Sequence, residues 1–235
     1  MQIHLLPIPY IVHSITNAVS LAPSVTSDHN QTLSFPAIST YREQMPAMFD
    51  FTTFPILTTE RLRLRRMVLA DREAIFAIRG NYEVTKYNIG AAYTDISQVE
   101  SLIHAMSSEY KREHTVRWGI TLPPEDTVVG MVGFNYWNRE NNNASVGFDL
   151  AQAYWRKGIM REALSAILDF GFNKDQMALH RVAADASIHN TASIQLMKSI
   201  GFQQEGILRD EYYEDGTYHD LVLLSVLEEE WQGRK

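Results

Sequence analysis

The 235-residue sequence contains no cysteine. This absence excludes disulfide bonds, zinc sites built on thiolates, CxxC redox chemistry and any acyl-cysteine intermediate. Positive charge is also scarce, because 21 Lys and Arg residues face 28 Asp and Glu residues and give a formal net charge of −7. A general binder of nucleic acid or of anionic membranes would carry a basic face, so we expect neither partner.

Long apolar runs are missing as well. The most apolar stretch near the start, residues 3–12, is interrupted by Pro7 and Pro9 and falls short of the roughly 20 residues that cross a bilayer. Since no Lys or Arg precedes it, it does not resemble a signal peptide either. Apolar residues make up 45% of the chain and charged residues 21%, as in ordinary globular proteins. These features predict a soluble, cytoplasmic protein with a sizeable core.

The composition changes near residue 55. Residues 1–55 hold four charged side chains and six of the eight prolines. Spread-out prolines block helix interiors and central strands, so we expect an irregular extension there and one folded domain over residues 56–235. An alternative is that translation begins at Met45 or Met48, in which case the upstream residues are an artefact of start assignment.

The remaining sequence is regularly patterned. Residues 60–65 alternate charged and apolar side chains, which is typical of a strand. Helical spacing predicts helices over residues 97–112, 160–173 and 192–200, and Asp71 is expected to cap an earlier helix. Strand-like runs occupy residues 117–122, 128–137, 144–150, 180–186, 206–213 and 221–227. Hairpins give antiparallel pairs, whereas the strand–helix–strand unit over residues 144–186 requires a parallel pair, so we expect an α/β fold with a mixed sheet flanked by helices.

A basic loop precedes the helix expected at residue 160. Arg156, Lys157 and Arg161 surround Gly158 there. The unpaired N–H groups and partial positive charge at a helix N-terminus attract anions, and a glycine lets the backbone approach a ligand closely. The pattern therefore predicts a phosphate or pyrophosphate site, although a solvated basic loop has the same composition. The glycine patterns of nucleotide P-loops and dinucleotide sites are both absent.

A second candidate lies just before the helix at residues 192–200. Asn190 is a strong N-cap residue, and capping alone explains it. The alternative is that its amide and the hydroxyl of Ser193 point into a cleft at the end of the preceding strand, where open α/β sheets bind ligands. No nucleophile elbow surrounds Ser193, which favours hydrogen-bond donation over covalent catalysis. The eight histidines lack metal-ligand spacing, so we predict no metal.

Together these motifs resemble the GNAT superfamily of acyl-CoA-dependent N-acetyltransferases, and most of all the Rim-type branch that acetylates ribosomal-protein N-termini. The resemblance covers residues 57–231. It depends on several motifs in a fixed order: Thr59-Glu60-Arg61-Leu62-Arg63-Leu64-Arg65, Val146-Gly147-Phe148-Asp149-Leu150, the loop from Trp155 to Ala163, Asn190-x-x-Ser193 with Lys198-x-x-Gly201-Phe202, and Tyr218-His219-Asp220.

The resemblance implies a GNAT-like fold, with a mostly antiparallel twisted sheet and acyl-CoA in the cleft between two splayed parallel strands. The residues that it places at the coenzyme are Phe148, Asp149, Leu150, Arg156, Lys157, Gly158, Ile159, Met160, Arg161, Asn190, Ser193 and Lys198. The family often has a small residue at the position of Met160. This side chain must therefore point away from the phosphates.

The same resemblance implies direct transfer of an acetyl group in a ternary complex, in which Ser193 protonates the departing thiolate. Base candidates are Glu211, Asp149 or a water chain. The Rim-type pattern has a glutamate at the position of Tyr212, so we include Tyr212 with Ser193 and Glu211 among the candidate catalytic residues. A slip of one residue reverses the face of a strand, and Glu211 is then expected to point away from the cleft.

The expected partners are acetyl-CoA and a primary amine, which is either a protein N-terminus or a small molecule. A homodimer is left open. The alternative function is a non-catalytic module that senses acyl-CoA or binds a partner protein.

Overall fold

The computed structural model of the protein describes residues 49–231, so most of the expected N-terminal extension lies outside the described residues. Within this range one sheet has the strand order β1-β2-β3-β4-β5-β6-β8-β7. The strands are β1 (Leu57–Thr58), β2 (Arg63–Arg65), β3 (Val116–Thr121), β4 (Gly130–Asn138), β5 (Asn143–Leu150), β6 (Arg181–Ser187), β7 (Gln203–Glu214) and β8 (Thr217–Leu227).

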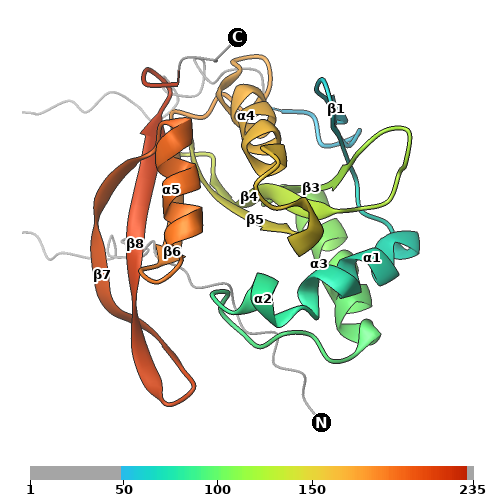
Figure 1. Ribbon diagram of the computed structural model, residues 1–235. Helices are drawn as coiled ribbons and strands as arrows, with labels where there is room; N and C mark the ends of the chain where they lie inside the picture. The colour runs from blue at the N-terminus through green and yellow to red at the C-terminus, as the bar shows by residue number, and fades with distance from the viewer. Residues whose placement is uncertain (1–48, 232–235) are drawn as a thin grey trace, which may run out of the picture. The chain divides into compact units, whose positions relative to one another are not determined.

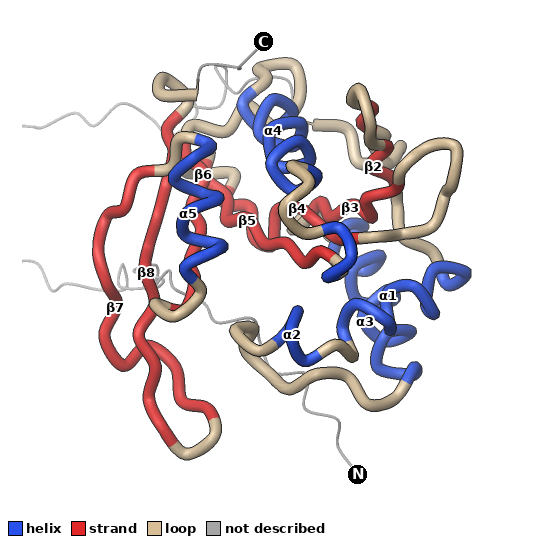
Figure 2. Tube along the Cα trace, in the orientation of Figure 1, coloured by secondary structure: helices blue, strands red, loops and turns tan. Residues whose placement is uncertain are grey.

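Only β5 and β6 pair in parallel among these strands, and every other neighbouring pair is antiparallel. The parallel register joins Asn143 to Arg181 and ends where Ser145 meets Ala183. Beyond that point the two strands separate (Figure 2). The expected mixed, mostly antiparallel sheet with two splayed parallel strands is thus confirmed.

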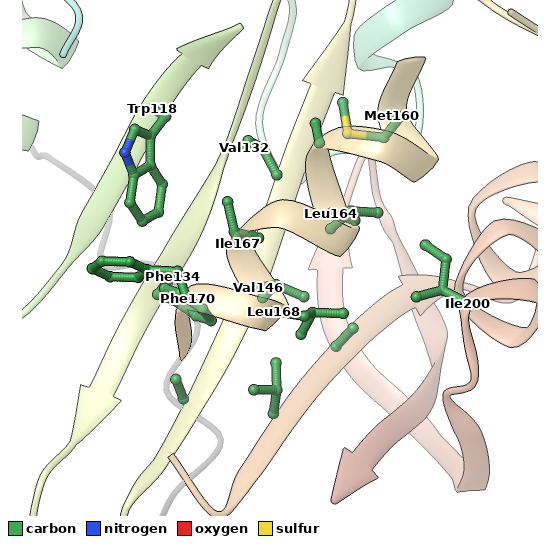
Figure 3. Packing of buried hydrophobic residues seen from close by; sticks show 14 of the residues in the cluster. Trp118, Val132, Phe134, Val146, Met160, Leu164, Ile167, Leu168, Phe170 and Ile200 are labelled. Atoms are coloured by element: carbon green, nitrogen blue, oxygen red, sulfur yellow. The ribbon is translucent and has the colours of Figure 1, made fainter. Parts of the chain in front are cut away.

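Helices cover both faces of the sheet (Figure 1). They are α1 (Arg72–Arg79), α2 (Tyr82–Thr85), α3 (Ile96–Lys111), α4 (Ile159–Phe172) and α5 (Thr191–Ile200), with 3₁₀ turns η2 (Leu69–Asp71) and η3 (Gln152–Tyr154). Because side chains alternate along a strand, Met131 of β4 packs with α1 and α3, whereas the adjacent Val132 packs with α4. The larger core lies on the α4 side, where these buried side chains meet: Val132, Phe134, Val146, Leu164, Ile167 and Leu168 (Figure 3).

The hairpin between β7 and β8 follows its sequence signal. Asp215 and Gly216 adopt φ angles of 49° and 82°. Two successive left-handed residues suit the tight turn of a two-residue hairpin, for which Asp-Gly is a favoured sequence. Both strands extend further than the sequence pattern predicts.

Two local expectations near the start of the domain are wrong. Only residues 63–65 of the strand expected over residues 60–65 form a strand, β2, because the Thr59 hydroxyl accepts the Leu62 N–H at 3.0 Å and the chain turns between β1 and β2. Asp71 stands at the N-cap position of α1 but does not cap it. Its carboxylate instead accepts the Val68 N–H at 2.8 Å and pairs with the guanidinium of Arg65 at 2.8 Å.

The chain entering the domain adds aromatic side chains to the core. Phe49, Phe51 and Phe54 pack against it. The indole N–H of Trp118 donates to the Pro55 carbonyl at 2.7 Å, and the Tyr110 hydroxyl donates to the Thr53 carbonyl at 3.0 Å. Residues 49–55, which the sequence pattern assigns to the extension, are therefore packed on the folded domain.

Candidate active site

The separation of β5 from β6 leaves part of β5 without a neighbouring strand on one side. The Ala151 N–H donates to the Val129 carbonyl on the β4 side at 2.9 Å. The carbonyl of Leu150 belongs to the same planar peptide and points the opposite way, toward the β6 side. It accepts the indole N–H of Trp155 at 2.8 Å. By the alternation along a strand, the main chain of Phe148 also faces the open side, and that of Asp149 faces β4.

The loop that follows β5 ends in a left-handed turn at the start of α4. Gly158 is the N-cap residue, with a φ of 76°, and no side chain caps the helix. The first bond of the helix runs from the Glu162 N–H to the Gly158 carbonyl at 3.1 Å. The N–H groups of Ile159, Met160 and Arg161 therefore precede the intrahelical ladder. This arrangement is suited to an anion, because unpaired donors and the helix dipole converge on one point.

The side chains around this turn divide into two groups. Arg156 and Lys157 are exposed, whereas Ile159 and Met160 are buried in the core. Since Met160 points into the core, its bulk does not obstruct the main chain at the turn. Arg161 is exposed, but its Nη1 donates to the Ser199 carbonyl of α5 at 3.2 Å. Arg156 and Lys157 are therefore the exposed cationic side chains of this loop that make no hydrogen bond to α5, and the Lys157 ammonium lies over the Tyr154 ring, 5.4 Å from its centroid.

The start of α5 lies after β6. Asn190 caps this helix, since its Oδ1 accepts the Ser193 N–H at 3.2 Å. Capping, the simpler of its two interpretations, is thus observed. Ser193 is half-buried. Lys198, in the last turn of α5, donates to Gln204 at 2.8 Å, so its ammonium has a partner on the protein.

Asp149, one of the three base candidates, is held in a buried network. It is 8% exposed. One carboxylate oxygen accepts from Arg79 at 3.2 Å and the other from the Asn88 amide at 2.8 Å. Arg117 lies nearby and donates to Asn135, and burial lowers the pKa of its guanidinium. With both oxygens engaged by neighbouring side chains, Asp149 is held in a buried ion-pair network.

A β-bulge in β7 determines where Glu211 and Tyr212 lie. The register with β8 shifts between Leu208 and Tyr212, and Asp210 adopts a φ of 53°. A bulge reverses the simple alternation of side chains. Tyr212 is hydrogen-bonded to Ser187 and stacks on His219 with 4.8 Å between ring centroids. Because of this bulge, simple alternation along the strand does not decide whether Glu211 faces the cleft or points away from it.

Asp185 of β6 is a candidate base that the sequence pattern did not single out. Desolvation and the nearby carboxylate of Glu211 raise the pKa of Asp185. It shares a sheet face with Ser187, the partner of Tyr212, because both are odd-numbered positions of one strand. The available signal was a lone carboxylate in the apolar run Val182-Ala183-Ala184-Asp185-Ala186, and the structure leaves this side chain exposed between buried neighbours.

Residues 49–231 contain neither a metal-ligand cluster nor a membrane-spanning helix. No group of three or more His, Asp or Glu residues there is arranged to hold a metal ion. No helix of the described chain has the length and apolar character needed to cross a membrane.

Comparison with known proteins places this geometry in a family. The acetyltransferase (GNAT) domain matches residues 61–203. An uncharacterized N-acetyltransferase, p20 of Bacillus licheniformis, is 36% identical over 177 residues, which cover 75% of this chain and 98% of that protein. The [ribosomal protein uS5]-alanine N-acetyltransferase of Escherichia coli is 28% identical over 123 residues, or 52% of this chain and 62% of that enzyme.

A solved structure shares the fold. RimL, a ribosomal L7/L12 α-N-protein acetyltransferase in complex with coenzyme A, superposes with a TM-score of 0.67 at 19% identity, covering 74% of this chain and 98% of that chain. The uncapped helix start beside an unpaired strand edge, the family match over residues 61–203 and the similarity to p20 agree with one another. The chain belongs to the GNAT family of N-acetyltransferases.

Proposed function

We propose that the protein transfers an acetyl group from acetyl-CoA to a primary amine by direct attack within a ternary complex. The observation that carries this proposal is the uncapped, left-handed start of α4 at Gly158, placed next to the edge of β5 that β6 leaves open. The first of these features suits the diphosphate of the coenzyme, and the second suits the amides of its pantetheine arm.

On the coenzyme side, the N–H groups of Ile159, Met160 and Arg161 would receive the diphosphate, with Arg156 and Lys157 adding positive charge. Phe148 offers main-chain groups to the pantetheine arm, as a neighbouring strand would. The RimL structure, which has the same fold, contains coenzyme A. We assign weaker roles to Arg161 and Lys198, because both side chains already bind acceptors on the protein.

On the acceptor side, Asp185 and Glu211 form a pair of neighbouring carboxylates. Such a pair attracts a cationic ammonium group, and a carboxylate whose pKa is raised is a better proton acceptor than an ordinary one. We therefore propose Asp185 as the base, with Glu211 beside it. A free α-amino group has a pKa of about 7.7–8.0, so a weak base is sufficient to generate its neutral form.

The acceptor proposed first is the α-amine of a protein N-terminus, and a small-molecule amine is the second choice. The E. coli relative acts on an alanine of a ribosomal protein, which supports the first class. The departing thiolate would be protonated by Ser193 at the start of α5, while Tyr212, held by Ser187 and His219, lines the same region.

The test is a thiol-release assay with acetyl-CoA against a panel of N-terminal peptides, polyamines, amino acids and aminoglycosides. We expect release that depends on one class of amine. The Ser193→Ala variant should turn over more slowly with little change in acetyl-CoA affinity. If coenzyme A binds and no amine on the panel gives release, the non-catalytic sensor is the better account.

A further inference from the structure

The Thr59-Glu60-Arg61 motif has no role in the function proposed so far, yet the structure connects it to the coenzyme loop. Arg61 lies between β1 and β2, more than ninety residues before α4. Its Nη1 donates to the Lys157 carbonyl at 3.0 Å. Its Nη2 lies 3.4 Å from the point that a Cβ on residue 158 would occupy. The guanidinium of Arg61 therefore lies directly against the turn that precedes α4.

The same guanidinium holds a carboxylate in the first turn of α4. Nε and Nη2 of Arg61 contact Oε2 of Glu162 at 2.7 and 2.6 Å. The other oxygen, Oε1, accepts the Arg61 main-chain N–H at 3.0 Å and the Thr59 hydroxyl at 2.6 Å. Both oxygens of Glu162 are thus bound by one short segment of chain. Desolvation opposes its ionisation, but these hydrogen bonds prevail and lower the pKa of Glu162.

The negative charge of Glu162 is unfavourable for a diphosphate bound at the start of α4. The Glu162 N–H makes the first bond of the helix, to Gly158, so its side chain stands within one turn of the donors that face the diphosphate. An uncompensated carboxylate there would repel phosphate groups. Arg61 supplies one positive charge directly on that carboxylate, and its side chain is still about half exposed, at 48%.

We propose that Arg61 is a positioning residue for the coenzyme: it joins the Lys157 carbonyl to Glu162, sets the left-handed turn at Gly158, and cancels the carboxylate charge that would otherwise weaken diphosphate binding. The inference rests on the proposed function. A positioning role for Arg61 makes one prediction that a purely structural ion pair does not. Removing the cation alone should harm coenzyme binding more than removing both charges.

The experiment compares Arg61→Met, Glu162→Gln and the double variant, each checked for an unchanged thermal melt. We expect Arg61→Met to raise the KM for acetyl-CoA at least tenfold with kcat changed less than twofold. Glu162→Gln should raise it no more than about threefold, and the double variant should resemble Glu162→Gln. Arg61→Lys, which keeps the charge and loses the planar fork, should fall between wild type and Arg61→Met.

The donor provides a second readout. S-acetylpantetheine carries the thioester and lacks the diphosphate, so the kcat/KM of all variants with this donor should match that of wild type. Arg72→Met is the matched control, because Arg72 forms an exposed ion pair with Glu100 at 3.1 Å, away from the coenzyme loop. It should leave both donors unaffected.

Three outcomes would overturn the proposal: equal effects of Arg61→Met and Glu162→Gln that add in the double variant, losses of the same size with S-acetylpantetheine, or no change in any variant. Failure of the proposed function looks different. In that case wild type itself would show no saturable dependence on acetyl-CoA. If Arg61→Met does not fold, Arg61→Lys and Glu162→Gln still decide the question through the same two donors.

Discussion

The main-chain N–H of Gly90 donates to Oε1 of Glu214 at 2.7 Å, across 124 positions of sequence. This bond connects the loop between α2 and α3 with the end of the β7–β8 hairpin (Figure 1). Asn88 of the same loop reaches Asp149 on β5. The loop therefore contacts both sides of the region where β5 and β6 separate, and we infer that it borders the entrance for the acceptor.

Glu214→Ala should raise the KM for the acceptor about 3- to 10-fold, because a typical hydrogen bond contributes a net free energy of about 0.5–1.5 kcal/mol. The KM for acetyl-CoA should not change. Glu214→Gln is the control, since it keeps an oxygen that can accept from Gly90. Steady-state kinetics with the amine identified in the thiol-release assay gives the KM for the acceptor and the KM for acetyl-CoA. Equal effects of Glu214→Ala on the two KM values would refute a role for Glu214 at the acceptor entrance.

Gly158→Ala tests the left-handed turn. A non-glycine residue in this conformation costs roughly 1–2 kcal/mol, and Gly158 has a φ of 76°. We expect coenzyme A affinity to fall about tenfold, as measured by calorimetry. Gly206→Ala is the matched control, because a Cβ there meets nothing within 4 Å and the backbone is not left-handed. Equal affinity in the two variants would contradict the requirement for the turn.

Asp149→Asn should destabilise the fold rather than slow the chemistry. Removing one partner of a buried ion pair costs about 3–5 kcal/mol of unfolding free energy, and the Arg79 and Asp149 side chains are only 15% and 8% exposed. Asp126→Asn, at a carboxylate that is 57% exposed, should cost less than about 1 kcal/mol. Urea unfolding compares the two variants. A loss of kcat in Asp149→Asn at unchanged stability would restore Asp149 as a base.

The sheet near its β7 edge should weaken in acid. Hydrogen bonds from Arg181 and Ser225 lower the pKa of Glu205 from 4.5 to about 2. Because the folded-state pKa is depressed, the stabilisation is fully present above pH 4.5 and is lost as the pH falls toward 2. The group is 37% exposed, so solvent screening limits the effect to about 1 kcal/mol. Urea unfolding at pH 7 and pH 3 should show a smaller difference for Glu205→Gln than for wild type, and an identical difference would refute the assignment.

Elements with strong periodicity could be predicted from the sequence. The helix α4 and the hairpin at Asp215-Gly216 lie where the pattern places them, because apolar spacing and turn chemistry are local properties. The bulge at Asp210 could not be predicted, since its register depends on pairing with β8. It moves Glu211 and Tyr212 relative to the faces that simple alternation gives them.

In the candidate site, too, motifs that are contiguous in sequence could be predicted and contacts between distant segments could not. Gly158 and its basic neighbours are contiguous in sequence and could be singled out, as could Asn190 and Ser193. The Arg61–Glu162 pair and the approach of Asp185 to Glu211 join segments far apart in the chain, so only the fold brings them together. The network that occupies Asp149 likewise draws on α1, the loop after α2 and β5.

The central claim is that main-chain donors at the start of α4, with Arg156 and Lys157 beside them, bind the diphosphate of acetyl-CoA. The direct measurement is a calorimetric titration of coenzyme A into wild type and into the double variant Arg156→Glu/Lys157→Glu. Charge-assisted hydrogen bonds contribute roughly 1.5–3 kcal/mol each, so the account predicts saturable binding to wild type and at least tenfold weaker binding to the variant. Equal affinities, or a wild type that binds no coenzyme, would contradict it.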